Sequence, residues 1–138
     1  MLLHASCVAI DNKAVLITGS SGSGKSDLAL RLIDGGAQLV SDDQTMLHCE
    51  KEILCASPPP AIEGMLEIRH LGLIRMHFVN AAPVALLIQL VGADEKIERL
   101  PEQTYVFLLD RRVQQLRLRS FEASTPAKIR AALKYSLL

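Results

Sequence analysis

The chain has 138 residues, and its fifteen basic and fifteen acidic side chains give a formal net charge of zero. This balance argues against an overall positive field that would attract nucleic acid or an anionic membrane. Apolar residues make up 49% of the chain and aromatic residues 4%, so we expect one domain over residues 1–138 with an aliphatic core. No apolar run reaches the ~18 residues of a membrane span and no secretory signal opens the chain, which predicts a cytoplasmic protein.

The three cysteines, Cys7, Cys49 and Cys55, form no C-x-x-C pair. An odd number of such thiols is typical of a reducing compartment rather than of a disulfide framework. His48 stands beside Cys49 and could join the cysteines in a metal site, but the spacing matches no zinc pattern. We therefore expect buried or half-buried strand residues here.

In chain order, a first strand is predicted over residues 3–10, and the turn at residues 11–13 leads into an apolar strand over residues 14–18. A helix is predicted over residues 25–34, where the apolar residues recur at helical spacing and Gly35 follows the last of them.

The segment between the second strand and this helix matches the phosphate-binding pattern G-x-x-x-x-G-K-[ST] at every fixed position. Its residues are Gly19, Ser20, Ser21, Gly22, Ser23, Gly24, Lys25 and Ser26. Glycines let the backbone turn its amides toward phosphate oxygens, and the helix N-terminus adds a positive dipole. Lys25 is expected to reach the β- and γ-phosphates of ATP, and Ser26 to coordinate Mg²⁺.

A strand over residues 37–40 ends in the adjacent acids Asp42 and Asp43. After a phosphate loop, an acid at a strand end is typical of a metal-facing or water-facing carboxylate. Two adjacent acids cannot both point along one strand face, so one of them is free for a role beyond metal binding.

The remaining chain is rich in strands. Residues 45–50 and 53–57 predict a hairpin, and the prolines that follow predict an extended exit from the sheet. The segment 64–74 alternates polar and apolar residues and predicts one strand, with Glu67 and Arg69 on the same face.

An apolar run over residues 83–91 predicts a buried central strand, and residues 92–102 a charged loop. Strands are predicted over residues 104–109 and 113–118, followed by a helix that Ser124 or Thr125 caps. This order lacks the regular βαβα alternation of adenylate-kinase-like folds.

Three segments together resemble the catalytic domain of the HPr kinase/phosphorylase family: residues 19–26, residues 39–43 and residues 65–72. The resemblance extends over residues 3–118. It implies an α/β fold with a strand-rich mixed sheet and a nucleotide-binding core like that of phosphoenolpyruvate carboxykinase. It also implies an ATP- and Mg²⁺-dependent kinase that phosphorylates a serine of the phosphocarrier protein HPr, which regulates the phosphotransferase system and carbon metabolism.

The resemblance also implies roles for individual residues. Asp42 matches the catalytic aspartate that takes the proton from the attacking serine, and Lys25 and His4 match two other active-site residues. Ser26 and Glu67 match the Mg²⁺ ligands. Asp43 and Arg69 are implied as supporting residues. The resemblance further implies that HPr is the protein substrate and that the chain forms a homo-oligomer, which is a hexamer in the family.

The sequence departs from the family pattern in three places. The chain begins almost at His4, which predicts a short form without the N-terminal domain, and His70 stands where the family usually has glycine. Residues 121–125 contain no counterpart of a catalytic arginine, so the resemblance supports the kinase activity more than the reverse, phosphorylase activity. Two alternatives stay open, a small-molecule kinase and a non-catalytic module that senses ATP.

Overall fold

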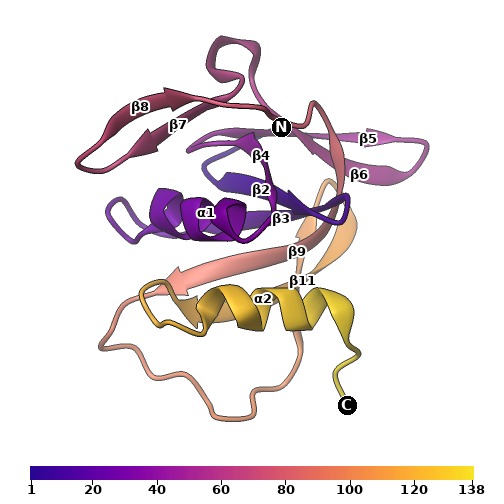
Figure 1. Ribbon diagram of the computed structural model, residues 1–138. Helices are drawn as coiled ribbons and strands as arrows, with labels where there is room; N and C mark the ends of the chain where they lie inside the picture. Colours follow the sequence, from indigo (N-terminus) through magenta and orange to yellow (C-terminus); the bar gives the residue numbers. More distant parts are fainter.

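The computed structural model describes residues 1–138 and contains a mixed, strongly curved sheet with both helices on one face (Figure 1). The elements in chain order are β1 (Leu2–Leu3), β2 (Ser6–Ile10), β3 (Lys13–Thr18), α1 (Lys25–Asp34), β4 (Gln38–Ser41), β5 (Thr45–Glu50), β6 (Ile53–Ser57), a 3₁₀ turn (Pro60–Ile62), β7 (Met65–Ile68), β8 (Gly72–Arg75), β9 (Ala82–Val91), β10 (Thr104–Leu108), β11 (Arg111–Arg119) and α2 (Thr125–Lys134). Neither helix is long and apolar enough to cross a membrane.

The sheet is built around β9, the long apolar strand that the sequence predicts at its centre. Strand β9 pairs in parallel with β3 on one side and with β11 on the other, and its first residues pair with β6. Strand β2 lies between β3 and β4 and is antiparallel to both. This arrangement confirms the strand-rich mixed α/β fold.

Alternate residues of β2, β3 and β9 divide between two hydrophobic clusters, one on each face of the sheet. Val15 and Ile88 belong to the cluster that Leu28 of α1 and Ile129 of α2 cover. Leu16 belongs to the opposite cluster, which the β5–β6 hairpin and β10 complete. The helical face of residues 25–34 is therefore buried as its apolar spacing predicts.

The prediction of one strand over residues 64–74 is wrong. The segment is a separate hairpin of β7 and β8, in which Glu67 pairs with Leu73, and the chain turns at residues 69–71. The turn includes His70, whose φ of +71° lies in the left-handed region. Arg69 therefore lies in a turn and does not share a strand face with Glu67.

The predicted strand over residues 3–10 is also interrupted. The chain bends at His4, so that β1 leaves to pair with β5 while β2 pairs with β3. His4 therefore lies between β1 and β2, outside both strands.

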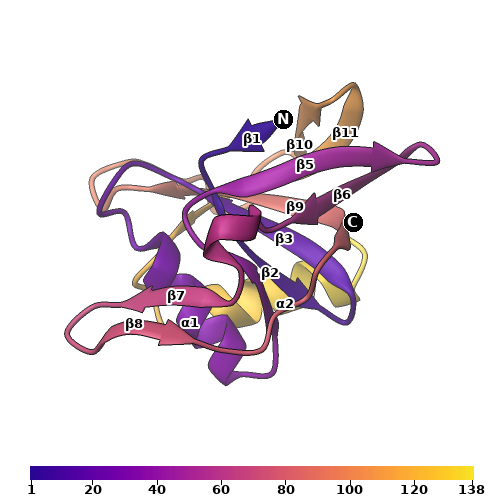
Figure 2. The ribbon, with the colours of Figure 1, turned by 90° about the horizontal axis from the view of Figure 1, so that it is seen from above.

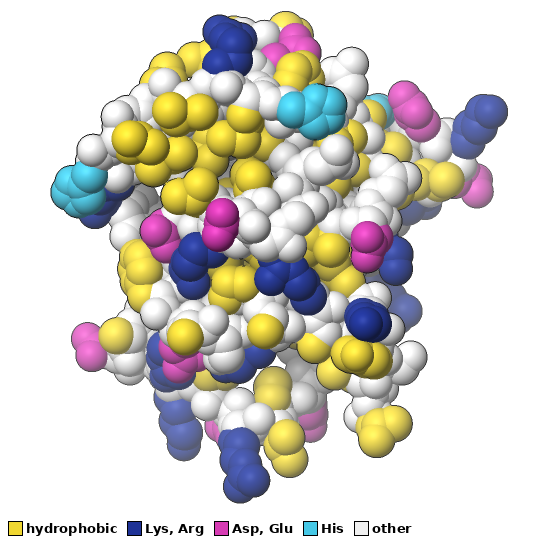
Figure 3. Space-filling view, viewed as in Figure 1, with side chains coloured by type: hydrophobic (Ala, Val, Ile, Leu, Met, Phe, Trp, Pro, Cys, Tyr) yellow, Lys and Arg dark blue, Asp and Glu magenta, His cyan; other side chains and the backbone are white.

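At one edge of the sheet, the ends of β3 and β4 lie beside the start of β2. Because β2 runs antiparallel to both β3 and β4, the start of β2 meets the carboxyl ends of the other two strands. The β7–β8 hairpin lies beside α1 at this edge (Figure 2). Hydrophobic side chains gather on the same part of the surface (Figure 3), and the exposed Leu71 and Leu73 belong to this hairpin.

Candidate functional site at the phosphate loop

The segment 19–24 connects β3 to α1 and has the backbone that its glycines predict. Gly22 and Gly24 have φ values of +78° and +98°, which L-residues rarely adopt. A Cβ atom on Gly24 would also lie 2.4 Å from the hydroxyl oxygen of Ser120. Glycine is therefore needed at position 24 for its conformation and for its small size.

The loop presents hydrogen-bond donors that have no acceptor within the chain. The Ser23 amide donates to the Ser20 carbonyl over 3.0 Å, and the buried Ser23 hydroxyl has no partner. The amides without an acceptor include those of Gly22, Gly24, Lys25 and Ser26. Open amides at a helix N-terminus suit a phosphate group, so the residues present fit a nucleotide phosphate.

Lys25 is the first residue of α1 and is largely buried. Its ammonium group donates to the carbonyl oxygens of Gly19 and Ser20 over 3.1 and 3.2 Å. These bonds hold a positive charge against the loop backbone, next to the open amides.

Asp42 follows β4 and is linked to three other elements through its carboxylate. One oxygen accepts hydrogen bonds from the hydroxyls of Ser26 on α1 and Ser6 on β2, over 2.7 and 2.8 Å. The other oxygen accepts a hydrogen bond from the backbone amide of Glu67 on β7 over 3.3 Å. The half-buried carboxylate is thus fixed beside the first turn of α1.

Asp43 points to different partners. Its backbone has a φ of +68°, and its amide donates to the Ser6 hydroxyl over 3.1 Å. Its carboxylate lies 2.8 Å from the Nε2 atom of His4, and both side chains are exposed. The two acids therefore diverge, and the structure brings His4 to the second of them.

The oxygen atoms around Asp42 suit a hard cation. The Ser26 hydroxyl is hydrogen-bonded to the Asp42 carboxylate. The backbone amide of Glu67, whose side chain is exposed, donates to the same carboxylate. Carboxylate and hydroxyl oxygens are ligands of Mg²⁺, and the donor set present fits that ion. Arg69 is exposed in the adjacent turn and forms no ion pair.

Sequence reasoning missed Ser6, which bonds to both acids. Ser6 opens β2 and is fully buried. The signal that could have identified it is the pairing of β2 with β4, which brings position 6 beside position 42. That pairing joins distant segments and has no local sequence mark.

A second missed feature is a link between the phosphate loop and the segment after β11. The Ser120 hydroxyl donates to the Gly24 carbonyl over 3.0 Å, and the Arg31 guanidinium donates to the Ser120 carbonyl and, over 3.4 Å, to the Glu122 carbonyl. Phe121 lies close to Gly24 and is exposed. The late segment therefore reaches the phosphate loop.

Two basic side chains of α2 are engaged by other protein groups. Lys128 lies 3.3 Å from Glu122, and Arg130 donates to the Leu32 carbonyl over 3.0 Å. Arg31 is likewise engaged, because it donates to the carbonyls of Ser120 and Glu122. Each of these three cations is therefore bound to another protein group.

These features define the class of α/β proteins in which a strand, a glycine-rich loop with the phosphate-binding pattern and a helix form one unit. A family model described as the HPr Serine kinase C-terminal domain matches residues 1–132, nearly the whole chain. The chain belongs to the HPr kinase/phosphorylase family.

Individual relatives agree with this assignment. HPr kinase/phosphorylases of Listeria welshimeri and Listeria monocytogenes are 48% identical over 75 residues, which is 54% of this chain. The matched part is 24% of the length of those relatives. The structure of the Hpr(Ser) kinase/phosphatase from Coxiella burnetii superposes with a TM-score of 0.86 at 31% identity, and covers 97% of this chain and 88% of that one.

Proposed function

We propose that this chain is a kinase domain that transfers the γ-phosphoryl group of ATP to a serine hydroxyl of HPr. The observation that carries the proposal is the Asp42 carboxylate, held by Ser26 at 2.7 Å beside the open amides of the phosphate loop. An acid at this place adjoins both the phosphate-binding residues and the exposed edge where an acceptor can approach.

The loop residues 19–26 would bind the nucleotide. Their open amides and the positive end of α1 neutralise phosphate charge, and Lys25 supplies a full positive charge. Ser26 and Glu67 would hold Mg²⁺, which supplies charge neutralisation on the phosphate oxygens when it is bound.

Asp42 would act as the base for the substrate serine. The hydrogen bonds from the hydroxyls of Ser6 and Ser26 hold its carboxylate in place, and it would accept a further one from the substrate serine. The pair of His4 and Asp43, 2.8 Å apart, would support this edge, and the exposed Arg69 would contact the protein substrate. Positioning and electrostatic stabilisation carry most of the rate in such a transfer.

The wider setting is the phosphotransferase system of the cytoplasm, where phosphorylation of HPr regulates carbon metabolism, and the chain would act as a homo-oligomer. The reverse reaction, attack of inorganic phosphate on phosphoserine, has less support, because Lys128, Arg130 and Arg31 are engaged by protein groups.

The test is the intact mass of HPr after incubation with the protein, ATP and Mg²⁺, beside the Asp42→Asn variant. We expect one added phosphate on a serine with the natural chain and none with the variant. Because Asn keeps the size of the side chain, ATP binding measured by calorimetry should stay within about threefold. An active variant would remove Asp42 from the role of base.

Other outcomes point elsewhere. ATP binding without transfer to HPr, but with transfer to a small acceptor, would indicate a small-molecule kinase. ATP binding with no transfer at all would indicate a module that senses ATP.

A further inference from the structure

A second cluster of reactive side chains lies on the β5–β6 hairpin, away from the phosphate loop. His48 and Cys55 face each other across the two strands, and Glu50 follows His48 by two positions. All three side chains therefore project from one face of the hairpin. The opposite face carries Leu47 and Leu54, which pack in the core.

The distances within this cluster suit a metal ion. The ligand atoms of the three residues all lie within 4.8 Å of one another, and His48 Nε2 is 3.4 Å from a Glu50 oxygen. Ligand bonds of about 2.0–2.3 Å in a tetrahedral site place neighbouring ligand atoms about 3.3–3.8 Å apart. The His48–Glu50 pair already has this separation. Rotation of the side chains can bring the Cys55 sulfur to a similar distance from the other two ligand atoms.

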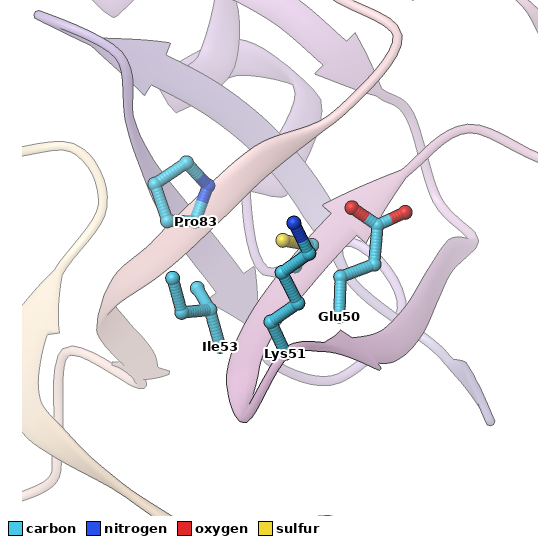
Figure 4. A pocket seen from close by; sticks show the side chains of 5 residues that line it. Glu50, Lys51, Ile53 and Pro83 are labelled. Atoms are coloured by element: carbon cyan, nitrogen blue, oxygen red, sulfur yellow. The ribbon is translucent and has the colours of Figure 1, made fainter.

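The surroundings leave room for a further ligand. The cluster opens on a pocket lined by Glu50, Lys51, Ile53, Cys55 and Pro83. Figure 4 shows the Lys51 amino group on the same side of the hairpin as the Glu50 carboxylate. Burial raises the pKa of the Cys55 thiol.

We propose that His48, Glu50 and Cys55 form a binding site for zinc, with a water molecule in the fourth position. One thiolate, one imidazole and one carboxylate favour this borderline-soft cation over Mg²⁺ or Ca²⁺, which take oxygen ligands. Binding forms a zinc–sulfur bond and releases the Cys55 thiol proton to solvent. The ion would join β5 to β6, beside the point where β6 pairs with β9.

The experiment uses the full chain without a histidine tag, freed of metal by a chelator. Zn²⁺ binding is measured by calorimetry with Mg²⁺ present, and Co²⁺ is the spectroscopic probe. We expect one Zn²⁺ per chain and a sulfur-to-cobalt charge-transfer band in the near ultraviolet. The Cys55→Ser variant should lose the band and bind Zn²⁺ at least about tenfold more weakly.

Matched controls separate this site from others. Cys49 is exposed on the opposite face of the hairpin, so Cys49→Ser should keep both the band and the affinity. Asp42→Asn should also keep them, because Asp42 belongs to the phosphate-loop edge. Lys51→Met should strengthen Zn²⁺ binding, because it removes a positive charge from the rim of the pocket.

His48→Gln keeps the test decisive if Cys55→Ser folds poorly, because His48 is only partly buried. It too should weaken Zn²⁺ binding at least about tenfold. The proposal is overturned if the natural chain binds no Zn²⁺ in the micromolar range. It is equally overturned if loss of Cys55 or His48 leaves binding unchanged, or if Cys49→Ser or Asp42→Asn abolishes it.

Discussion

Ser6 connects the two acids of the proposed catalytic edge. Its hydroxyl donates to Asp42 and accepts from the Asp43 amide, and the residue is fully buried. Ser6→Ala leaves the Asp43 amide without its acceptor and Asp42 without one of two hydroxyl donors. We expect kcat for HPr to fall about tenfold or more, and the free energy of unfolding to fall by about 1–2 kcal/mol.

The readout that distinguishes positioning from general damage is the split between kinetic parameters. KM for ATP should change little in Ser6→Ala, because Ser6 touches neither Lys25 nor the loop amides. Ser6→Thr keeps the hydroxyl and should recover part of kcat. A matching loss of kcat in both variants would contradict the role.

Gly22 and Gly24 form a natural pair for testing the phosphate loop. Both have positive φ, but nothing lies within 4 Å of a Cβ built on Gly22, whereas a Cβ on Gly24 meets Ser120 and Phe121. Gly22→Ala should cost about 1–2 kcal/mol through backbone strain alone. Gly24→Ala should cost more and weaken ATP binding, as measured by urea unfolding and calorimetry. Equal losses would contradict the importance of the contact with Ser120.

Among the elements, the β7–β8 hairpin carries the strongest departure from the sequence prediction. Residues 64–74 keep their polar and apolar alternation through the turn, and the turn has no Asn-Gly or Asp-Gly signal. Its reversal depends on His70 at a φ of +71°, a conformation that histidine adopts more readily than most side chains. Glycine, which the family pattern leads one to expect at this position, adopts this conformation without strain.

His70→Gly should therefore stabilise the hairpin. The substitution removes the left-handed strain of a residue with a Cβ, and we expect the free energy of unfolding to rise by up to about 1 kcal/mol. Arg69→Gly is the matched control, because residue 69 does not have a positive φ and glycine there only adds freedom to the unfolded chain. Urea unfolding of both variants checks the difference. A gain in Arg69→Gly as large as in His70→Gly would contradict the explanation.

What the sequence predicted well shares one property, a signal within a few neighbouring residues. The loop pattern at residues 19–26, the helix after it and the apolar strand over 83–91 are all of this kind, and the fold confirms the helix and the strand. Ser6 and the link through Arg31 depend on segments far apart in the chain. The cluster of His48, Glu50 and Cys55 depends on the register of two strands, which spacing alone does not give.

At the scale of the whole molecule, folding places one cysteine out of reach of solvent. Cys7 lies in the cluster between the sheet and the β5–β6 hairpin, and burial raises the pKa of its thiol far above the usual value near 8.5. Above about pH 8.5 the unfolded chain loses this proton while the folded chain keeps it. The folded state then binds more protons, so stability falls as pH rises, by at most about 1.4 kcal/mol per pH unit for this one group.

Other groups also ionise at alkaline pH, so the prediction is a difference between two proteins. Cys7→Ala removes the thiol, and its free energy of unfolding should fall less steeply between about pH 8.5 and pH 10.5 than that of the natural chain. The cavity left by the lost sulfur lowers stability at every pH alike and does not change the slope. Urea unfolding across this range measures both slopes. Parallel slopes would mean that the Cys7 thiol ionises as readily in the folded core as in the unfolded chain, which would contradict its position between the sheet and the hairpin.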